Sequence, residues 1–356
     1  SHRQIIGSLY RGGRSQVEIA GDRIMNSITT QESIRQQHPG TRVEEIPVID
    51  IADYLSGGPG ALGFVASLLR DALENIGFFC ITNHGVPQSL IDRTFNETRR
   101  FHDLPHAVKM DVAVNRDNVG FMPTEGETVR TSPYASADIK ADVGEAFFVK
   151  RDQASAPLAI ENQWPRNLPG FRDTIVEYYD AMERLAQRLL PIYAVALDVP
   201  PCYFDPAFSS PNNLSILRIA HFPPDPLDEN QFNVGPHTDG SFFTLLPATE
   251  VPGLELYCQS GNWFLAQPPS GSIVVNAGDM LTRWTNGRFL STPHRVRSIS
   301  GRDRYSIPLF YQPNPDQILE CLPSCRGADR PDPEPPISAR DYFDWFMQQN
   351  FAHATE

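Results

Sequence analysis

The sequence lacks the features that mark disulfide-rich, cysteine-metal and membrane proteins. Its 356 residues include five cysteines, and no two of them form a Cys-x-x-Cys pair. An odd number of cysteines without paired spacing argues against a disulfide framework and against a cysteine zinc site. No run reaches the about 18 to 20 apolar residues that a membrane-spanning helix needs, and the first residues lack the apolar centre of a signal peptide. These absences predict a cytoplasmic protein with no membrane partner.

Basic residues are also scarce. The chain has 30 Lys and Arg against 43 Asp and Glu, which gives a formal net charge of −13 at pH 7. Phosphate backbones and anionic lipid surfaces repel such a chain, so nucleic acid is not an expected partner. The hydrophobic share of 40% and the charged share of 21% are those of an ordinary globular protein. We expect a compact body, and no obligate protein partner is evident.

The apolar pattern changes along the chain and predicts four regions. Residues 1–45 have little periodicity and predict an extended arm, whereas residues 46–205 mix short strands with amphipathic helices. Residues 206–315 contain short β-type runs between Gly, Pro and Asn turns, which is typical of a jelly roll or barrel. Residues 316–356 form an extension with a helix around 339–347. The predicted β-type runs are 214–222, 242–246, 254–258, 262–265, 272–276, 292–298 and 304–311.

One set of residues in the β-rich region has the composition of a metal site. His237-Thr238-Asp239 places an imidazole and a carboxylate on the same side of an extended chain, and His294 stands on a later run. Two imidazoles and one carboxylate on one face of iron(II) leave three positions for other ligands and O2. An isolated His-x-Asp pair is more often an ordinary pair of polar residues, so the prediction depends on what accompanies it.

A second pair of polar residues follows the metal-site candidates. In Arg304-Tyr305-Ser306, the Arg and Ser side chains alternate onto one face of the chain. A guanidinium and a hydroxyl on one face can hold the distal carboxylate of a dicarboxylate by charge-assisted hydrogen bonds. Together the two patterns indicate a metal enzyme with a dicarboxylate cosubstrate.

The order His237-x-Asp239, His294, Arg304-x-Ser306 resembles the isopenicillin N synthase-like family of 2-oxoglutarate and iron(II) dependent oxygenases. The resemblance extends over roughly residues 46 to 345, because further segments look like the markers of that family in its order. These segments are Ile46-Pro47-Val48-Ile49-Asp50, Gly77-Phe78-Phe79, Asn83-His84-Gly85, Asn162-Gln163-Trp164-Pro165, Pro252-Gly253-Leu254 and Asn276-Ala277-Gly278-Asp279. The resemblance implies an α+β fold with a mainly β core, a double-stranded β-helix or distorted jelly roll with flanking helices.

The resemblance also implies the chemistry. His237, Asp239 and His294 would bind Fe(II), and Arg304 and Ser306 would hold 2-oxoglutarate, with O2 as the other cosubstrate. The implied function is a dioxygenase of specialised metabolism that hydroxylates, desaturates or cyclises a small organic molecule and releases succinate and CO2. Asp239 excludes the halogenating variant, in which a small residue replaces the carboxylate. Three alternatives stay open: an oxidase driven by ascorbate or by its substrate, an enzyme that fragments 2-oxoglutarate, and a metal-binding or sensing module without catalysis.

The run 217–222 departs from the family pattern. Many members carry a Tyr that helps to bind the oxoglutarate carboxylate, often with an Asn two residues earlier, where this chain has Phe222 and Ala220. Neither side chain donates a hydrogen bond. Alternation puts Arg218 on their face, so we predict that it points inward and binds a carboxylate, either that of the substrate or the one the missing Tyr would have served. The alternative is a strand twist that turns Arg218 outward.

Aromatic residues near the expected pocket are further candidates for substrate contact. In resembling enzymes such contacts come from the loop near Gly120-Phe121, the strand at Phe147-Phe148 and the end of the last core strand at Phe310-Tyr311. Aromatic residues at such places are about as often core as pocket lining. The predicted substrate candidates are Arg218, Phe222, Phe121, Phe148 and Phe310.

Five other residues receive a weaker or structural interpretation. Arg130 lies in an irregular segment, where a solvated charge is the more common role, and it is kept only as a secondary carboxylate anchor. His84, His102, His106 and His221 are predicted to be structural and are left out of the metal site.

Overall fold

The computed structural model describes residues 45–124, 140, 142–151, 160–209, 213–224, 227, 231–257, 260–297, 301–327 and 330–350. The predicted arm, apart from Glu45, and the secondary candidate Arg130 lie outside these residues. None of the described helices has the length and apolar composition needed to cross a lipid bilayer.

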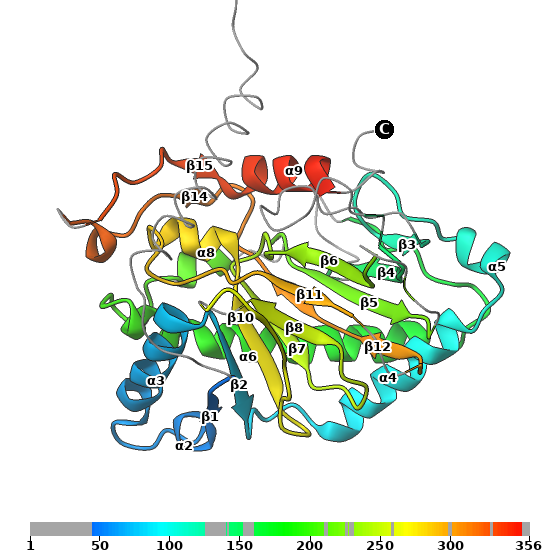
Figure 1. The fold of residues 1–356 in the computed structure, drawn as a ribbon, viewed down its shortest axis with the longest axis horizontal. Coiled ribbons are helices and arrows are strands. Elements are labelled where there is room, and N and C mark those ends of the chain that lie inside the picture. The colour runs from blue at the N-terminus through cyan, green and yellow to red at the C-terminus, as the bar shows by residue number, and fades with distance from the viewer. Residues whose placement is uncertain are drawn as a thin grey trace, which may run out of the picture.

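Helices cover the outside of a large sheet (Figure 1). Two of them, α3 (Ala61–Asn75) and α6 (Phe171–Ala196), pack together, and α6 runs behind the strands in this view. Their apolar residues recur every three or four positions and are buried, as the sequence pattern predicts. The other helices are α2 (Ala52–Leu55), α4 (Gln88–His102), α5 (His106–Met110), α7 (Asp205–Phe208), α8 (Asp279–Trp284), the 3-10 helix η1 (Pro323–Cys325) and α9 (Ala339–Asn350).

The glycine that ends α3 fits a position that no other residue can occupy without strain. Gly77 has a φ of 77°, in the left-handed region, and a Cβ there would lie 2.3 Å from the carbonyl oxygen of Leu290. The close approach lets the chain turn directly from α3 into β2 (Phe78–Thr82), whose first residue then contacts the candidate metal site.

The strands of the large sheet have the order β1-β2-β10-β7-β13-β5-β4-β3, and β12 also pairs with β5. A four-stranded sheet has the order β6-β11-β8-β9, and β14 pairs with β15. The bounds of the strands other than β2 are β1 (Val48–Asp50), β3 (Gly120–Met122), β4 (Glu145–Val149), β5 (Ile216–Phe222), β6 (Val234–His237), β7 (Phe243–Pro247), β8 (Leu254–Tyr257), β9 (Trp263–Leu265), β10 (Ile273–Ala277), β11 (His294–Val296), β12 (Arg304–Ser306), β13 (Leu309–Tyr311), β14 (Ile318–Leu319) and β15 (Ile337–Ser338).

The two larger sheets pack face to face around a small apolar cluster. Phe78 and Val274 of the large sheet belong to the same buried cluster as Leu254 and Leu256 of the four-stranded sheet. The main core lies between the large sheet and the helices α3 and α6. This arrangement is the predicted fold, a jelly roll with flanking helices.

One predicted run divides into two strands in the structure, and one strand is missing from the prediction. The run 304–311 divides into β12 and β13 at Ile307-Pro308, because proline has no N–H to continue the ladder. The strand β6 was not predicted, because Gly235-Pro236 has the composition of a turn. This strand carries His237, so the missed element is one that positions the site.

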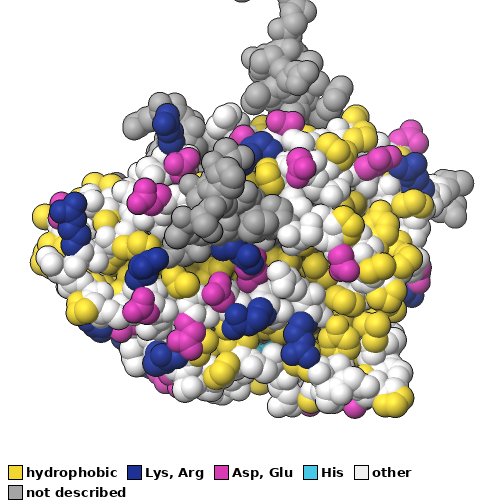
Figure 2. Space-filling model, turned by 180° about the vertical axis from the view of Figure 1, so that it is seen from behind, with side chains coloured by type: hydrophobic (Ala, Val, Ile, Leu, Met, Phe, Trp, Pro, Cys, Tyr) yellow, Lys and Arg dark blue, Asp and Glu magenta, His cyan; other side chains and the backbone are white. Residues whose placement is uncertain are grey.

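The surface seen from behind has mixed charge. Figure 2 shows Lys and Arg side chains interspersed with Asp and Glu and with apolar side chains on the described part of this face. No continuous basic surface is visible among those residues, in agreement with the net charge of −13.

Candidate functional site

Two neighbouring strands bring the predicted metal ligands together. In the antiparallel pair of β6 and β11, His294 lies opposite His237, and the two imidazole centroids are 4.2 Å apart. Asp239 stands in the turn after β6. Its Oδ1 atom is 3.6 Å from Nε2 of His237 and 3.5 Å from Nε2 of His294. The three atoms are close enough to bind one metal ion.

Backbone carbonyl groups orient both imidazoles so that each Nε2 atom faces Oδ1 of Asp239. Nδ1 of His237 lies 2.8 Å from the carbonyl oxygen of Gly235, and Nδ1 of His294 lies 3.1 Å from that of Thr292. Donation from Nδ1 to a carbonyl leaves the Nε2 lone pair for a metal. The ring of Phe78 packs edge-on against His294 with centroids 5.3 Å apart, which restricts that ring further.

Asp239 is held by two donors that the sequence interpretation did not identify. Thr244 donates to its Oδ2 atom at 2.5 Å and Asn276 donates to the same atom at 2.7 Å, so Oδ1 faces the imidazoles. Burial of Asp239 opposes ionisation, but His294 and His237 outweigh it and hold the pKa of the carboxyl well below its ordinary value. Thr244 and Asn276 are cross-strand partners in β7 and β10. Facing polar residues in two apolar strands were the signal that could have revealed them.

Arg304 and Ser306 lie on one face of β12, opposite Phe222 and Ala220 of β5. Arg304 is 3% exposed, its guanidinium carbon lies 5.3 Å from the centre of the Phe222 ring, and burial lowers the pKa of the group to about 10. Its Nε and Nη1 atoms have no hydrogen-bond partner among the described residues. A buried guanidinium with two unpaired nitrogen atoms is costly, so the site fits an anionic ligand such as a carboxylate.

A cavity next to the metal-ligand candidates contains three of the predicted substrate residues. Arg218 points inward, as strand alternation predicts, and its guanidinium carbon lies 5.8 Å from the centre of the Phe148 ring. Gln312 and the C-terminal helix were not predicted to contribute. The cavity is lined by His237, Asp239, Arg218, Phe148, Phe310, Ile216, Gln312, Asn118, Gly240, Ser241, Phe343, Phe346 and Met347.

Two predicted substrate residues have other surroundings. Phe121 does not line this cavity: it is fully buried, packs on Phe101 and lies under the ammonium group of Lys109, as a core residue does. Phe222 also does not line it. Its contact with Arg304 places it beside the expected carboxylate anchor.

The helix α9 forms one wall of the cavity through Phe343, Phe346 and Met347. A Cβ at Gly240 would lie 2.9 Å from the Phe346 ring, so the glycine that follows Asp239 allows this close approach. The sequence pattern predicted the helix but only as a packing element. Its contribution to the pocket depends on the path of the chain after β13, which local periodicity does not report.

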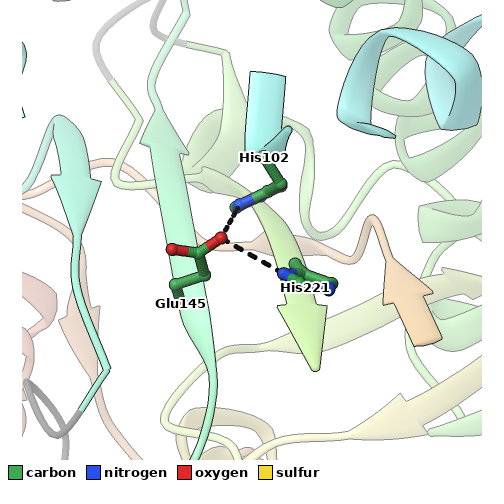
Figure 3. A group of neighbouring side chains, drawn as sticks. All are labelled: His102, Glu145 and His221. Carbon is green, nitrogen blue, oxygen red and sulfur yellow. Dashed lines mark hydrogen bonds and ion pairs between the residues drawn. The ribbon is translucent and has the colours of Figure 1, made fainter. Parts of the chain in front are cut away.

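A second group of metal-ligand types lies elsewhere (Figure 3). Nδ1 of His102 and Nδ1 of His221 are 2.8 Å and 3.1 Å from Oε1 of Glu145. Lys109 donates to both oxygens of Glu145 at 2.7 Å. The carboxylate of Glu145 is bound by the ammonium group of Lys109 and lies at hydrogen-bond distance from both imidazoles. Its oxygens are therefore not available to a metal ion, and we interpret this cluster as a polar network, not as the iron site.

Comparisons with known families agree with this geometry. The family model of the 2OG-Fe(II) oxygenase superfamily matches residues 213–313. A model of the N-terminal region of the non-haem dioxygenases in morphine synthesis matches residues 46–167. The chain is 35% identical to the 2-oxoglutarate-Fe(II) type oxidoreductase hxnY of Emericella nidulans, over 86% of this chain and 91% of the relative. It is 30% identical to kihadalactone A synthase of Citrus sinensis, over 86% and 93%.

Solved structures give the same result. A 2OG-Fe(II) oxygenase family protein of Caulobacter crescentus superposes with a TM-score of 0.74 at 27% identity, covering 86% of this chain and 99% of that one. A Neurospora crassa protein solved in complex with alpha-KG and thymine superposes with a TM-score of 0.73 at 26% identity, covering 87% and 98%. The chain therefore belongs to the 2OG-Fe(II) oxygenase superfamily and is an oxidoreductase that depends on 2-oxoglutarate and Fe(II).

Proposed function

We propose that the protein is a dioxygenase that oxidises a small organic molecule and releases succinate and CO2. In this proposal His237, Asp239 and His294 bind iron, and Arg304 and Ser306 hold the distal carboxylate of 2-oxoglutarate. The observation that carries it is the buried guanidinium of Arg304, whose Nε and Nη1 atoms have no hydrogen-bond partner among the described residues. When bound, iron and 2-oxoglutarate supply the reduction of O2, with one oxygen atom entering succinate and the other serving to oxidise the substrate.

The residues around the site have separate tasks in this reaction. Thr244 and Asn276 fix the carboxylate of Asp239 so that one oxygen is presented to the metal. Arg304 neutralises and orients the cosubstrate, which fixes the direction of its chelating end. The aromatic walls from β4, β13 and α9 exclude water from the reacting bond.

The cavity favours a small substrate with a flat or apolar body and an acceptor group. Phe148, Phe310 and Phe346 supply aromatic surface, and Arg218 supplies a cation in the same cavity as His237 and Asp239. Arg304 does not line that cavity, which supports the substrate, and not 2-oxoglutarate, as the ligand of Arg218. Thymine, the small flat ligand with carbonyl acceptors in the complex of the Neurospora crassa protein, supports a molecule of this size and kind.

The function is tested by the balance of products. Purified protein with iron(II), 2-oxoglutarate and O2 is incubated with a metabolite pool, and mass spectrometry follows changes of about +16 or −2 mass units while succinate and CO2 are quantified. We expect one succinate for each oxidised product. Product without succinate would favour the ascorbate-driven or substrate-driven oxidase, and succinate-free breakdown of 2-oxoglutarate would favour its fragmentation. Iron binding without any turnover would favour a sensing module.

The role of Arg218 can be separated from that of Arg304. Replacing Arg218 by Met removes the cation and keeps an unbranched side chain, so the KM for the substrate should rise about 10- to 100-fold, the effect of losing one charge-assisted hydrogen bond. The KM for 2-oxoglutarate should stay unchanged. A rise in the KM for 2-oxoglutarate would reassign Arg218 to the cosubstrate, and no change in either constant would remove it from the site.

A further inference from the structure

The strand that carries the expected 2-oxoglutarate anchor has few backbone partners. In the described residues β12 pairs with β5 alone, through Arg304 with Phe222, Tyr305 with His221 and Ser306 with Ala220. A strand of three residues with one neighbour is weakly fixed by its own ladder. Its position therefore depends on the side chains of its outer face.

The outer face of β12 is attached to β5 through His221. The ring of His221 stacks on Tyr305 with centroids 4.9 Å apart and an angle of 18° between the planes. Nε2 of the same ring lies 2.7 Å from Oδ1 of Asp303, the residue before β12. The guanidinium of Arg99 covers the Tyr305 ring at 5.5 Å. These contacts hold the strand from the side opposite to Arg304 and Ser306.

The other edge of His221 is attached to the body of the protein. Its Nδ1 atom contacts Glu145 of β4, which also contacts His102 of α4 (Figure 3). Lys109 of α5 donates to the same carboxylate. Burial lowers the pKa of His221, but Glu145 and Asp303 outweigh it and raise the pKa above its ordinary value. A protonated ring donates from both nitrogens, so it can bridge the two carboxylates at once.

We propose that His221 and Asp303 are positioning residues for 2-oxoglutarate, which hold β12 so that Arg304 and Ser306 reach the cosubstrate carboxylate. The inference rests on the proposed function, because it takes Arg304 and Ser306 as the anchor. Neither residue touches the cosubstrate, since the side chain of His221 alternates to the face opposite to Arg304 and Ser306, and Asp303 contacts His221. They act on its affinity through the position of the strand.

The test compares two substitutions with a neighbouring control. His221→Gln removes the stacked cation and one of its two bridges, whereas Asp303→Asn leaves the ring and removes one charge from a half-exposed position. Arg302→Gln is the control, because Arg302 is adjacent in sequence, exposed, and 3.9 Å from an exposed Glu250 that lies outside the network. Calorimetric titration of the anaerobic iron(II)-loaded protein with 2-oxoglutarate measures affinity without turnover.

We expect affinity for 2-oxoglutarate to fall about 10-fold in His221→Gln and several-fold in Asp303→Asn, in the range found for groups that orient a ligand-binding residue. Iron affinity and kcat at saturating 2-oxoglutarate should stay within about twofold, a separation that general destabilisation would not produce. Asp303→Glu should restore most of the affinity.

The outcomes separate this inference from the function on which it rests. Loss of 2-oxoglutarate affinity in Arg304→Met, with unchanged affinity in both His221→Gln and Asp303→Asn, would overturn the positioning role alone. Unchanged affinity in Arg304→Met would overturn the anchor assignment and this inference with it. If His221→Gln does not fold, Asp303→Asn still decides, because Asp303 is half exposed and the amide oxygen of Asn can still accept from Nε2 of His221.

Discussion

Replacement of His237, Asp239 or His294 by Ala should lower iron(II) affinity by more than about 100-fold and abolish succinate release. Even residues that only orient a metal ligand typically contribute about 10- to 100-fold, so loss of a ligand should exceed that range. The fold should survive, because the apolar clusters of the core include none of the three side chains. Anaerobic iron titration and circular dichroism measure the two effects.

The matched control for these variants is His106→Ala. His106 is an exposed histidine at the start of α5 and belongs to neither group of potential metal ligands in the described residues. Its replacement should leave iron affinity unchanged. Near-normal turnover in His294→Ala, with the control also active, would contradict the ligand assignment.

Replacement of Arg304 by Met should weaken 2-oxoglutarate binding strongly. Truncating one partner of a buried charge-assisted contact costs about 2 to 5 kcal/mol, which corresponds to about 30-fold to several thousand-fold in affinity. Iron affinity should not change, because Arg304 is on β12 and the ligands are on β6, β11 and the turn after β6. Titration of the anaerobic iron(II) protein with 2-oxoglutarate measures the loss.

The same variant, Arg304→Met, should weaken 2-oxoglutarate binding but raise the thermal stability of the cosubstrate-free protein. The Nε and Nη1 atoms of the buried Arg304 have no hydrogen-bond partner among the described residues, so Arg304→Met should raise the Tm of the cosubstrate-free protein. Added 2-oxoglutarate should raise the Tm of the wild type and have little effect on the variant. A variant that binds 2-oxoglutarate normally, or that is destabilised only in its absence, would contradict the assignment of Arg304.

The metal-ligand candidates and the fold could be predicted because their signals are local. His237, Asp239 and His294 stand in an order typical of a known family, and the long helices have a clear apolar period. Strand alternation also gave the inward direction of Arg218, because it needs only one element. These predictions depend on residues close in sequence or on a collinear set of motifs.

The remaining parts of the site depend on contacts between distant elements. Thr244 and Asn276 hold Asp239 only because β7 and β10 are neighbours, and the order of strands in a sheet has no local signature. Phe121 is suited to a pocket by its residue type, but its strand turns it into the aromatic core beside Phe101. The dipeptide Gly235-Pro236 favours a turn, so its sequence does not predict β6. Pairing of β6 with β11 outweighs this local preference.

The residues of α9 that line the cavity lie outside the segments that match the family models. The proposed iron and cosubstrate residues lie within 213–313, one of the two segments that match family models, whereas Phe343, Phe346 and Met347 lie beyond both. In the proposed function, α9 contributes to the selectivity for the substrate and carries none of the proposed metal or cosubstrate ligands. We therefore expect that exchange of α9 changes which molecule enters the cavity and leaves the proposed iron ligands in place.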